Sequence, residues 1–124
     1  MSAAEIGKQL VAYCKAGENM TSIENLYAAD VVSVEAAQPP SGGDRVTNGI
    51  DGVKAKNKWW VENHEVHSAD VEGPYPHGDD RFAVRFKYDI TNKPSGMRVK
   101  MDEVGVFTVA DGKVVREEFY YEMG

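Results

Sequence analysis

Residues 80–91, DRFAVRFKYDIT, alternate between apolar and polar side chains. A period of two is typical of a β-strand with one buried face, because successive side chains of a strand point to opposite sides. The side chains between the apolar ones are mostly charged, so we expect the second face to be solvated or lightly covered. A sheet of this kind buries its apolar face against another layer of structure. The residues expected on the buried face are Phe82, Val84, Phe86, Tyr88 and Ile90.

The last third of the chain is predicted to form a long β-hairpin that turns at Asp111-Gly112. Its register matters because a slip of one residue moves every side chain to the other face. A two-residue loop would pair Phe107 with Arg116 and would mix charged and aromatic side chains on both faces. We therefore expect a three-residue loop that also includes Ala110, with Gly112 in the left-handed position of a bulge.

The three-residue loop gathers apolar and acidic side chains on one face of the hairpin. Two acids, Glu103 and Glu117, are expected on that face beside Gly105, which has no side chain. In an apolar, aromatic concavity, burial and mutual repulsion would keep one of these acids protonated. The expected pairs are Phe107 with Val115, Gly105 with Glu117 and Glu103 with Phe119. The apolar members of this face are Met101, Phe107, Val115, Phe119 and Tyr121.

Two helices are predicted at the N-terminal end of the chain. Ser2 and Glu5 match a capping box at the start of a first helix over roughly residues 3–16. Thr21 and Glu24 repeat this pattern, and we expect a short second helix to follow them closely.

The second helix should end near Asp30 and lead into a strand over residues 31–36, VVSVEA. In this strand the valines alternate with Ser33 and Glu35, which therefore share the opposite face. Residues 37–48 contain Pro and Gly and are predicted to form a loop within the domain.

A third helix is predicted from residues 48–51 to about residue 63, and residues 65–73 should form the next strand. The apolar side of the helix is typical of one that packs on a core. That side carries Val53, Trp60, Val61 and His64, and the other positions carry Lys54, Lys56 and Lys58.

The composition limits the classes of function. The chain of 124 residues has a net charge of −6, with 20 acidic against 14 basic side chains. We do not expect it to bind nucleic acid, because phosphates attract an excess of Lys and Arg. It contains no apolar run long enough to cross a membrane. One cysteine, Cys14, and no recognisable signal peptide favour a cytoplasmic protein, and we expect a single domain over residues 1–124.

The order of these segments resembles the SnoaL-like branch of the nuclear transport factor 2-like superfamily, which includes ketosteroid isomerases and polyketide cyclases. The resemblance rests on AYCKAGE in the first helix, LYAADVVSVEA around the first strand, GIDGVK at the third helix and DGKVVREEFYYE near the end. It implies an α+β, cystatin-like fold in which a cone-shaped, curved antiparallel sheet wraps around three N-terminal helices. It also implies a homodimer formed through the sheet.

The resemblance implies a position for a catalytic base. In ketosteroid isomerases an Asp at the end of the first strand removes a proton, while a Tyr and a protonated Asp bind the oxyanion. The base position falls on Glu35 here. The Tyr position holds no tyrosine, although Tyr13 lies one turn away, and the protonated Asp position holds Gly105. Glu103 or Glu117 is expected to supply the missing donor from a different backbone position.

Histidine and aromatic side chains complete the expected site. His67 is a candidate proton shuttle because it shares a strand face with Ala69 and Val71. A metal site built on His64 and His67 is not expected, because no third ligand follows at a characteristic spacing. The residues expected to contact a substrate are Tyr13, Trp60, His64, Phe86, Phe107, Phe119 and Tyr121.

The sequence leaves open what the site does. It contains no P-loop, dinucleotide-binding fingerprint or nucleophile elbow, so we expect no cofactor. The expected ligand is a small, apolar or carbonyl-bearing molecule. Glu35 would remove a proton next to the carbonyl group in a cofactor-independent isomerase, cyclase or lyase such as a dehydratase. The alternative is a non-catalytic ligand-binding or dimerisation module of the same fold.

Overall fold

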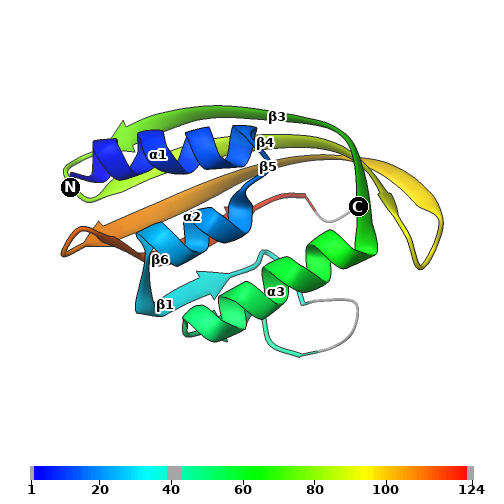
Figure 1. Ribbon diagram of the computed structural model, residues 1–124, viewed down its shortest axis with the longest axis horizontal. Coiled ribbons are helices and arrows are strands. Elements are labelled where there is room, and N and C mark those ends of the chain that lie inside the picture. Colours follow the sequence, from blue (N-terminus) through cyan, green and yellow to red (C-terminus); the bar gives the residue numbers. More distant parts are fainter. Residues whose placement is uncertain (1, 39–42, 123–124) are drawn as a thin grey trace.

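The computed structural model describes residues 2–38 and 43–122. Three helices lie over one side of a six-stranded sheet (Figure 1). Residues 39–42 of the predicted loop and residue 123 of the predicted C-terminal hairpin lie outside the described residues. The helices are α1 (Ala3–Lys15), α2 (Asn19–Leu26) and α3 (Ile50–Asn63). The strands are β1 (Tyr27–Val34), β2 (Val46–Asn48), β3 (His64–His77), β4 (Arg81–Asn92), β5 (Met97–Ala110) and β6 (Lys113–Tyr120).

The sheet is curved and unclosed, and its strands follow the order β2-β1-β6-β5-β4-β3 (Figure 1). The predicted α+β fold, a curved sheet around three helices, is confirmed. One detail is wrong, because β1 and β6 pair in parallel whereas the other neighbours pair antiparallel. Most of the chain separates β1 from β6, so no tight turn forces them to run in opposite directions.

The two N-terminal helices follow different capping rules. At α1 the Ser2 side chain accepts from the Glu5 backbone and the Glu5 side chain accepts from the Ser2 backbone, which confirms the predicted capping box. The capping box predicted at Thr21 is wrong, since α2 begins at Asn19 and has no side-chain cap. Strand β1 starts at Tyr27, directly after α2, and so the predicted end near Asp30 is also wrong.

The β5–β6 hairpin differs from the predicted register. Asp111 and Gly112 have φ angles of 52° and 74°, and Ala110 pairs with Lys113, which defines a two-residue turn. A bulge then inserts Val115, so that Phe107 lies opposite Glu117 and Gly105 opposite Phe119. The predicted three-residue loop and its pairs are therefore wrong.

The acids and aromatic side chains predicted on the inner face of the hairpin nevertheless lie on that face. The observed register differs from the predicted one by two positions, and a shift of two keeps every side chain on its own face. Glu117 and Phe107 are both buried, at 4% and 1% exposure, and Glu103 is largely buried. Val115 was predicted to be buried, but it is the bulged residue, and Val114 is buried in its place.

Strand β4 and helix α3 both direct apolar side chains into the space between the sheet and the helices. The alternation predicted for β4 is confirmed, since Phe82, Val84, Phe86 and Ile90 are buried and Tyr88 packs against the core. On α3, Val53 is buried and Trp60 half-buried. Val61 is 55% exposed, so its predicted place on the packed side of α3 is wrong.

The outer face of the sheet is charged. Arg85 pairs with Asp102 at 2.7 Å and Arg98 pairs with Asp89 at 2.9 Å. Within the described ranges, no helix is both long and apolar enough to cross a bilayer. Dimerisation through this sheet, the single-domain boundaries and a cytoplasmic location stay predictions.

Candidate functional site

The end of strand β1 presents two polar side chains to the interior of the cone. Ser33 is fully buried, and the Glu35 side chain is 23% exposed. The backbone at Glu35 is held by Arg45, since the Glu35 N–H donates to the Arg45 carbonyl at 2.9 Å and Arg45 Nε donates back to the Glu35 carbonyl at 3.0 Å. Glu35 therefore has a fixed backbone at the point where the strand ends.

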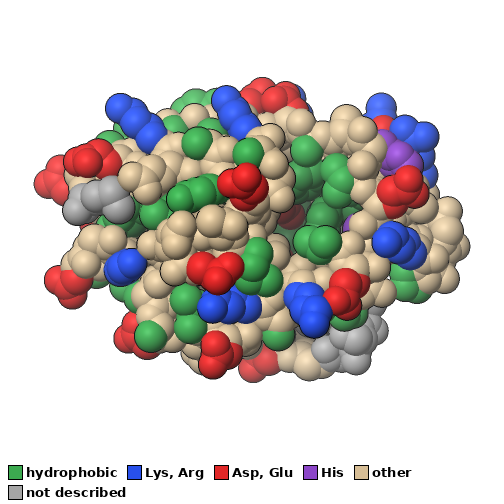
Figure 2. All heavy atoms as spheres, in the orientation of Figure 1, with side chains coloured by type: hydrophobic (Ala, Val, Ile, Leu, Met, Phe, Trp, Pro, Cys, Tyr) green, Lys and Arg blue, Asp and Glu red, His purple; other side chains and the backbone are tan. Residues whose placement is uncertain are grey.

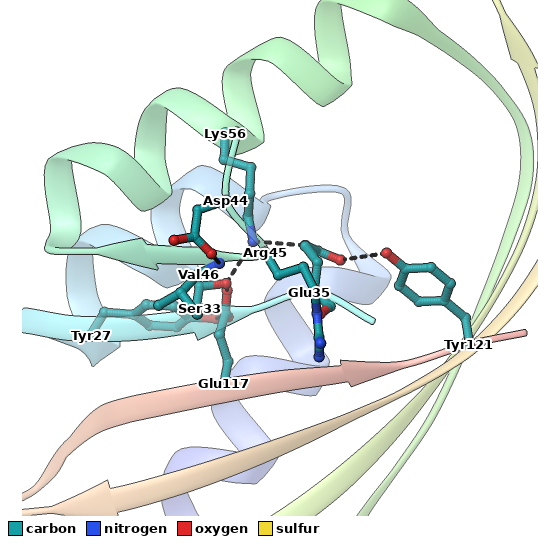
Figure 3. Close-up of polar contacts among 9 residues, drawn as sticks. All are labelled: Tyr27, Ser33, Glu35, Asp44, Arg45, Val46, Lys56, Glu117 and Tyr121. Atoms are coloured by element: carbon teal, nitrogen blue, oxygen red, sulfur yellow. Dashed lines mark hydrogen bonds and ion pairs between the residues drawn. The ribbon is translucent and has the colours of Figure 1, made fainter. Parts of the chain in front are cut away.

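Helix α3 brings a lysine to these two side chains. Lys56 follows Val53 by three residues and precedes Trp60 by four, which places it on the same side of the helix. Its Nζ lies 2.7 Å from Glu35 Oε1 and 2.6 Å from Ser33 Oγ (Figure 3). The Lys56 side chain is only 26% exposed, so these two contacts replace much of its hydration.

Glu117 on β6 continues this chain of hydrogen bonds into the core. Lysine can only donate, so Ser33 Oγ accepts a hydrogen bond from Lys56 and donates one to Glu117 Oε2 at 2.6 Å. The Tyr27 hydroxyl donates to Glu117 Oε1 (Figure 3). Burial raises the pKa of Glu117, and the hydrogen bonds from Ser33 and Tyr27 oppose that rise. Both carboxyl oxygens of Glu117 are thus already engaged.

Tyr121, just beyond β6, completes the cluster at its other end. Its hydroxyl donates to Glu35 Oε2 at 3.1 Å (Figure 3). Burial, and then the nearby charge of Glu35, raise the pKa of Tyr121 to about 12. The hydroxyl therefore keeps its proton at neutral pH and remains a donor.

Glu103 on β5 is the third carboxyl group of the interior. It lies opposite Phe86 on β4. Burial raises its pKa to about 7, with a further increase from the charge of Glu35 and an opposing effect of Lys56. No group within residues 2–38 and 43–122 hydrogen bonds to its carboxyl oxygens, in contrast to Glu35 and Glu117. Among these three acids, Glu103 is therefore the one whose carboxyl oxygens no described side chain engages.

Aromatic rings line the interior beside these acids. Trp60 stacks on His64 with ring centroids 4.5 Å apart and lies 5.6 Å from Tyr88. Phe86 and Tyr88 stack at 6.1 Å. On the hairpin, Phe107 meets Phe119 edge to face at 6.2 Å, and Lys56 Nζ lies 5.4 Å from the centre of the Phe119 ring.

Two predicted site residues lie apart from the carboxyl cluster. His67 sits at a bulge in β3, is exposed, and contacts Thr91 through Nε2 at 2.6 Å on the outer side of the sheet. The expectation that it faces the interior is wrong, because the bulge removes it from the inner row of side chains. Tyr13 on α1 packs against the core, and its hydroxyl accepts from Asn25 at 3.1 Å.

A cleft opens between the α1–α2 turn and α3. Its volume is about 310 Å³. Figure 2 shows this face of the molecule hollowed, with hydrophobic side chains inside the hollow. None of the predicted substrate-contacting residues lines the cleft itself. The lining residues are Gly17, Asn19, Met20, Asn57, Lys58, Val61 and Glu62.

Comparison with known proteins places the chain in a family. The SnoaL-like domain family matches residues 1–121, which is nearly the whole chain. The chain belongs to the SnoaL-like family. A Mesorhizobium loti protein, provisionally named a SnoaL-like polyketide cyclase and also labelled a carbohydrate phosphatase, is 47% identical with a TM-score of 0.90, covering 98% of this chain and 100% of that one. No sequence among the curated proteins matches.

More distant structures share the SnoaL-like fold alone. A Mycobacterium tuberculosis protein solved with estradiol-17β-hemisuccinate has a TM-score of 0.76 at 18% identity, covering 99% of this chain and 96% of that one. A Catenulispora acidiphila protein with a ketosteroid isomerase-like fold, solved with trimethylamine, has a TM-score of 0.72 at 19% identity, covering 96% of this chain and 86% of that one. Both bind small molecules on this scaffold.

Sequence reasoning missed three members of this SnoaL-like site: Lys56, Ser33 and Tyr27. A signal existed for Lys56, because its spacing from Val53 and Trp60 places it on the packed side of α3. No comparable signal marked Ser33 and Tyr27, whose role depends on the long-range pairing of β1 with β6.

Proposed function

We propose that the protein binds a small, largely apolar carbonyl compound in the cone and transfers a proton next to the carbonyl group without a cofactor. The observation that carries this proposal is Glu103, a largely buried carboxyl group with a pKa of about 7 and no hydrogen-bond partner in the described parts of the chain. A pKa near the working pH suits a general acid or base. Glu35 forms an ion pair with Lys56, with Nζ 2.7 Å from Oε1.

The two acids take different roles in this proposal. Glu35 removes a proton from the carbon beside the carbonyl group. The electron pair of that C–H bond forms a carbon–carbon double bond, and the π pair of the C=O bond moves onto the oxygen. Protonated Glu103 donates a hydrogen bond, or its proton, to this oxygen and so stabilises the enol or enolate. Isomerisation, cyclisation and dehydration can all begin with this step. Glu117 does not touch the substrate, because Tyr27 and Ser33 occupy both of its oxygens.

The aromatic lining supports an apolar ligand. Trp60, His64, Phe119 and Tyr121 are partly exposed and are proposed to contact it. Phe86 and Phe107 are buried and are proposed to form the wall behind these contacts. The small molecules bound by the M. tuberculosis and C. acidiphila proteins support a ligand site on this scaffold.

One observation favours a second candidate, a protein that binds such a ligand without turnover. Both oxygens of Glu35 are already engaged, Oε1 by Lys56 and Oε2 by Tyr121. A base held in this way must release one partner before it can reach a C–H bond. With Glu35 held by both partners, the protein would bind the ligand without turning it over.

Proton exchange separates the two candidates. The probe is 2-tetralone, an apolar cyclic ketone with exchangeable protons beside its carbonyl group, and tetralin, which lacks the carbonyl group, is the control ligand. Binding is followed by the shift in melting temperature, and exchange of the ketone protons in D2O by NMR. We expect wild-type protein to bind 2-tetralone and exchange its protons. We expect Glu35→Gln to bind the ketone but to exchange its protons at about one hundredth of the wild-type rate or lower.

The matched control is Glu118→Gln, on the outer face beside Arg116, which should leave exchange unchanged. Binding by the wild type without any exchange would select the binding module instead. If a panel of cyclic ketones that includes 2-tetralone gives neither binding nor exchange, both candidates are wrong.

A further inference from the structure

Lys56 is half-buried beside an acid, unlike its neighbour Lys58 on the same helix. The Lys58 side chain is 72% exposed, whereas Lys56 is 26% exposed and makes close contacts with Glu35 and Ser33. Taking an ammonium group out of water is costly unless its charge is compensated. The position of Lys56 therefore needs an explanation beyond the packing of α3.

The charges around the two proposed catalytic acids are unbalanced. Glu103 is influenced by the charges of Glu35 and Glu117, which both raise its pKa, and by Lys56, which lowers it. Among the titratable groups that the described elements direct at this interior, Lys56 is the one lysine or arginine. These groups are Cys14 on α1, Tyr27 and Glu35 on and after β1, Lys56 on α3, His64 at the start of β3, Tyr88 on β4, Glu103 on β5, Glu117 on β6 and Tyr121 after β6.

The cation is placed on one acid and not on the other. Nζ of Lys56 contacts Glu35 directly at 2.7 Å, whereas no hydrogen bond joins it to Glu103 in the described structure. The charge of Glu35 raises the pKa of Glu103, so ionisation of one acid opposes ionisation of the other. A cation bound to Glu35 decides that Glu35 is the ionised partner.

We propose that Lys56 is a positioning residue that keeps Glu35 a carboxylate while Glu103 carries the proton. The effect of Lys56 on catalysis rests on the proposed function, in which Glu35 is the base and Glu103 is the acid. The electrostatic consequence does not depend on any substrate. The hydrogen bond to Ser33 fixes Lys56 in this place, since Ser33 is itself tied to buried Glu117.

Carboxyl titration by NMR tests the electrostatic part without a substrate. The side-chain carboxyl carbons of Glu35 and Glu103 are followed from pH 5 to 9 in wild-type protein and in Lys56→Met, which keeps an unbranched side chain but no charge. We expect the Glu103 titration of the variant to move up by about one pH unit. We also expect Glu35 to be less fully ionised at pH 7 than in the wild type.

Two further variants separate charge from shape. Lys56→Arg keeps the charge and should keep the wild-type order of ionisation. Lys54→Met lies two residues away on α3, where the side chain leaves the helix in another direction, and should change neither titration. If Lys56→Met does not fold, Lys56→Gln replaces it as the uncharged variant. Wild-type titrations of both acids in the folded uncharged variant would overturn the proposal.

The exchange of 2-tetralone then tests the catalytic part. We expect Lys56→Met to exchange the ketone about 100-fold more slowly at pH 7 and to regain rate at a moderately higher pH, where Glu35 ionises while Glu103 still carries its proton. Lys56→Arg should recover part of the rate. Altered titrations with no exchange by any form, including wild type, would uphold the role of Lys56 and reject the proposed function. Unaltered titrations reject the role of Lys56 whatever the exchange rates show.

Discussion

The Ser33 hydroxyl lies 2.6 Å from Oε2 of Glu117 at the buried end of the interior cluster. Ser33 is fully buried and Glu117 is 4% exposed, so this hydrogen bond forms away from water. With Tyr27 on its other oxygen, each carboxyl oxygen of Glu117 accepts a hydrogen bond from the protein. Glu117 therefore ties β6 to β1 in the core of the protein.

Truncation of Glu117 should destabilise the protein strongly. In Glu117→Ala the hydroxyl groups of Tyr27 and Ser33 lose their acceptor in a buried place, and we expect the free energy of unfolding at pH 7 to fall by about 3 kcal/mol. Urea denaturation measures this change. Glu118→Ala is the matched control, because Glu118 pairs with Arg116 on the partly exposed face and should change stability by about 0.5 kcal/mol or less. Equal effects of the two substitutions would contradict the buried role of Glu117.

Glu103 should make stability depend on pH. Its pKa is about 7 in the folded protein against 4.5 for an ordinary carboxyl group, so the folded state binds the proton more tightly. Its contribution is fully present below pH 4.5 and is lost as the pH rises through 7. We expect this loss to be about 2 to 3 kcal/mol, and Glu103→Gln, which cannot ionise, should lack it.

Urea denaturation at pH 4.5 and pH 8 checks this prediction for wild type and Glu103→Gln. The control is Asp102→Asn, one residue away on the outer face, where Arg85 holds the pKa of the carboxyl below its usual range. In Asp102→Asn the free energy of unfolding should still fall between pH 4.5 and pH 8, as it does in the wild type. An undiminished loss in Glu103→Gln would show that Glu103 is not the group responsible.

Gly105 leaves room for two aromatic rings of the interior wall. A Cβ atom at this position would lie 2.9 Å from the Phe107 ring and 3.2 Å from the Phe119 ring. Because Phe107 is buried and cannot move aside freely, we expect Gly105→Ala to cost about 1 to 3 kcal/mol in the free energy of unfolding. Thermal and urea denaturation measure it. The double variant with Phe119→Leu should recover part of the loss, and no recovery would contradict the steric cause.

The two tryptophans should report differently on a bound ligand. Trp60 is half-buried against His64 and Tyr88, whereas Trp59 is 42% exposed. A ligand in the cone should change the fluorescence of Trp60, so Trp59→Phe should keep the response to 2-tetralone and Trp60→Phe should lose it. Isothermal calorimetry shows whether each variant still binds the ketone. A response that disappears only with Trp59→Phe would place the ligand outside the cone.

The sequence predicted those parts of the site that depend on strand periodicity. Glu35 and Ser33 face inward because side chains alternate along β1, and Glu103 and Glu117 share the inner face although the predicted register was wrong. The error shifted the hairpin by two positions, which leaves the faces unchanged. Local alternation was therefore enough to bring the acids to one side of the sheet.

Features that depend on a single inserted residue or on distant partners were not predictable. The bulges at His67 and Val115 carry no clear sequence signal, and the first of them turns His67 away from the interior. The direction of the long Lys56 side chain depends on Glu35 and Ser33, which lie more than twenty residues away in the sequence. Side-chain networks of this kind appear only when the elements are assembled.

The pH dependence of proton exchange tests the proposed acid–base function most directly. With 2-tetralone as the probe, exchange by wild-type protein should decline by about tenfold per pH unit above pH 7, as Glu103 loses its proton. Glu103→Gln should exchange more slowly at pH 7 and should show no such decline, because its amide cannot ionise. If the wild type shows no decline above pH 7, or if Glu103→Gln shows the same decline as the wild type, Glu103 is not the acid and the proposed function is contradicted.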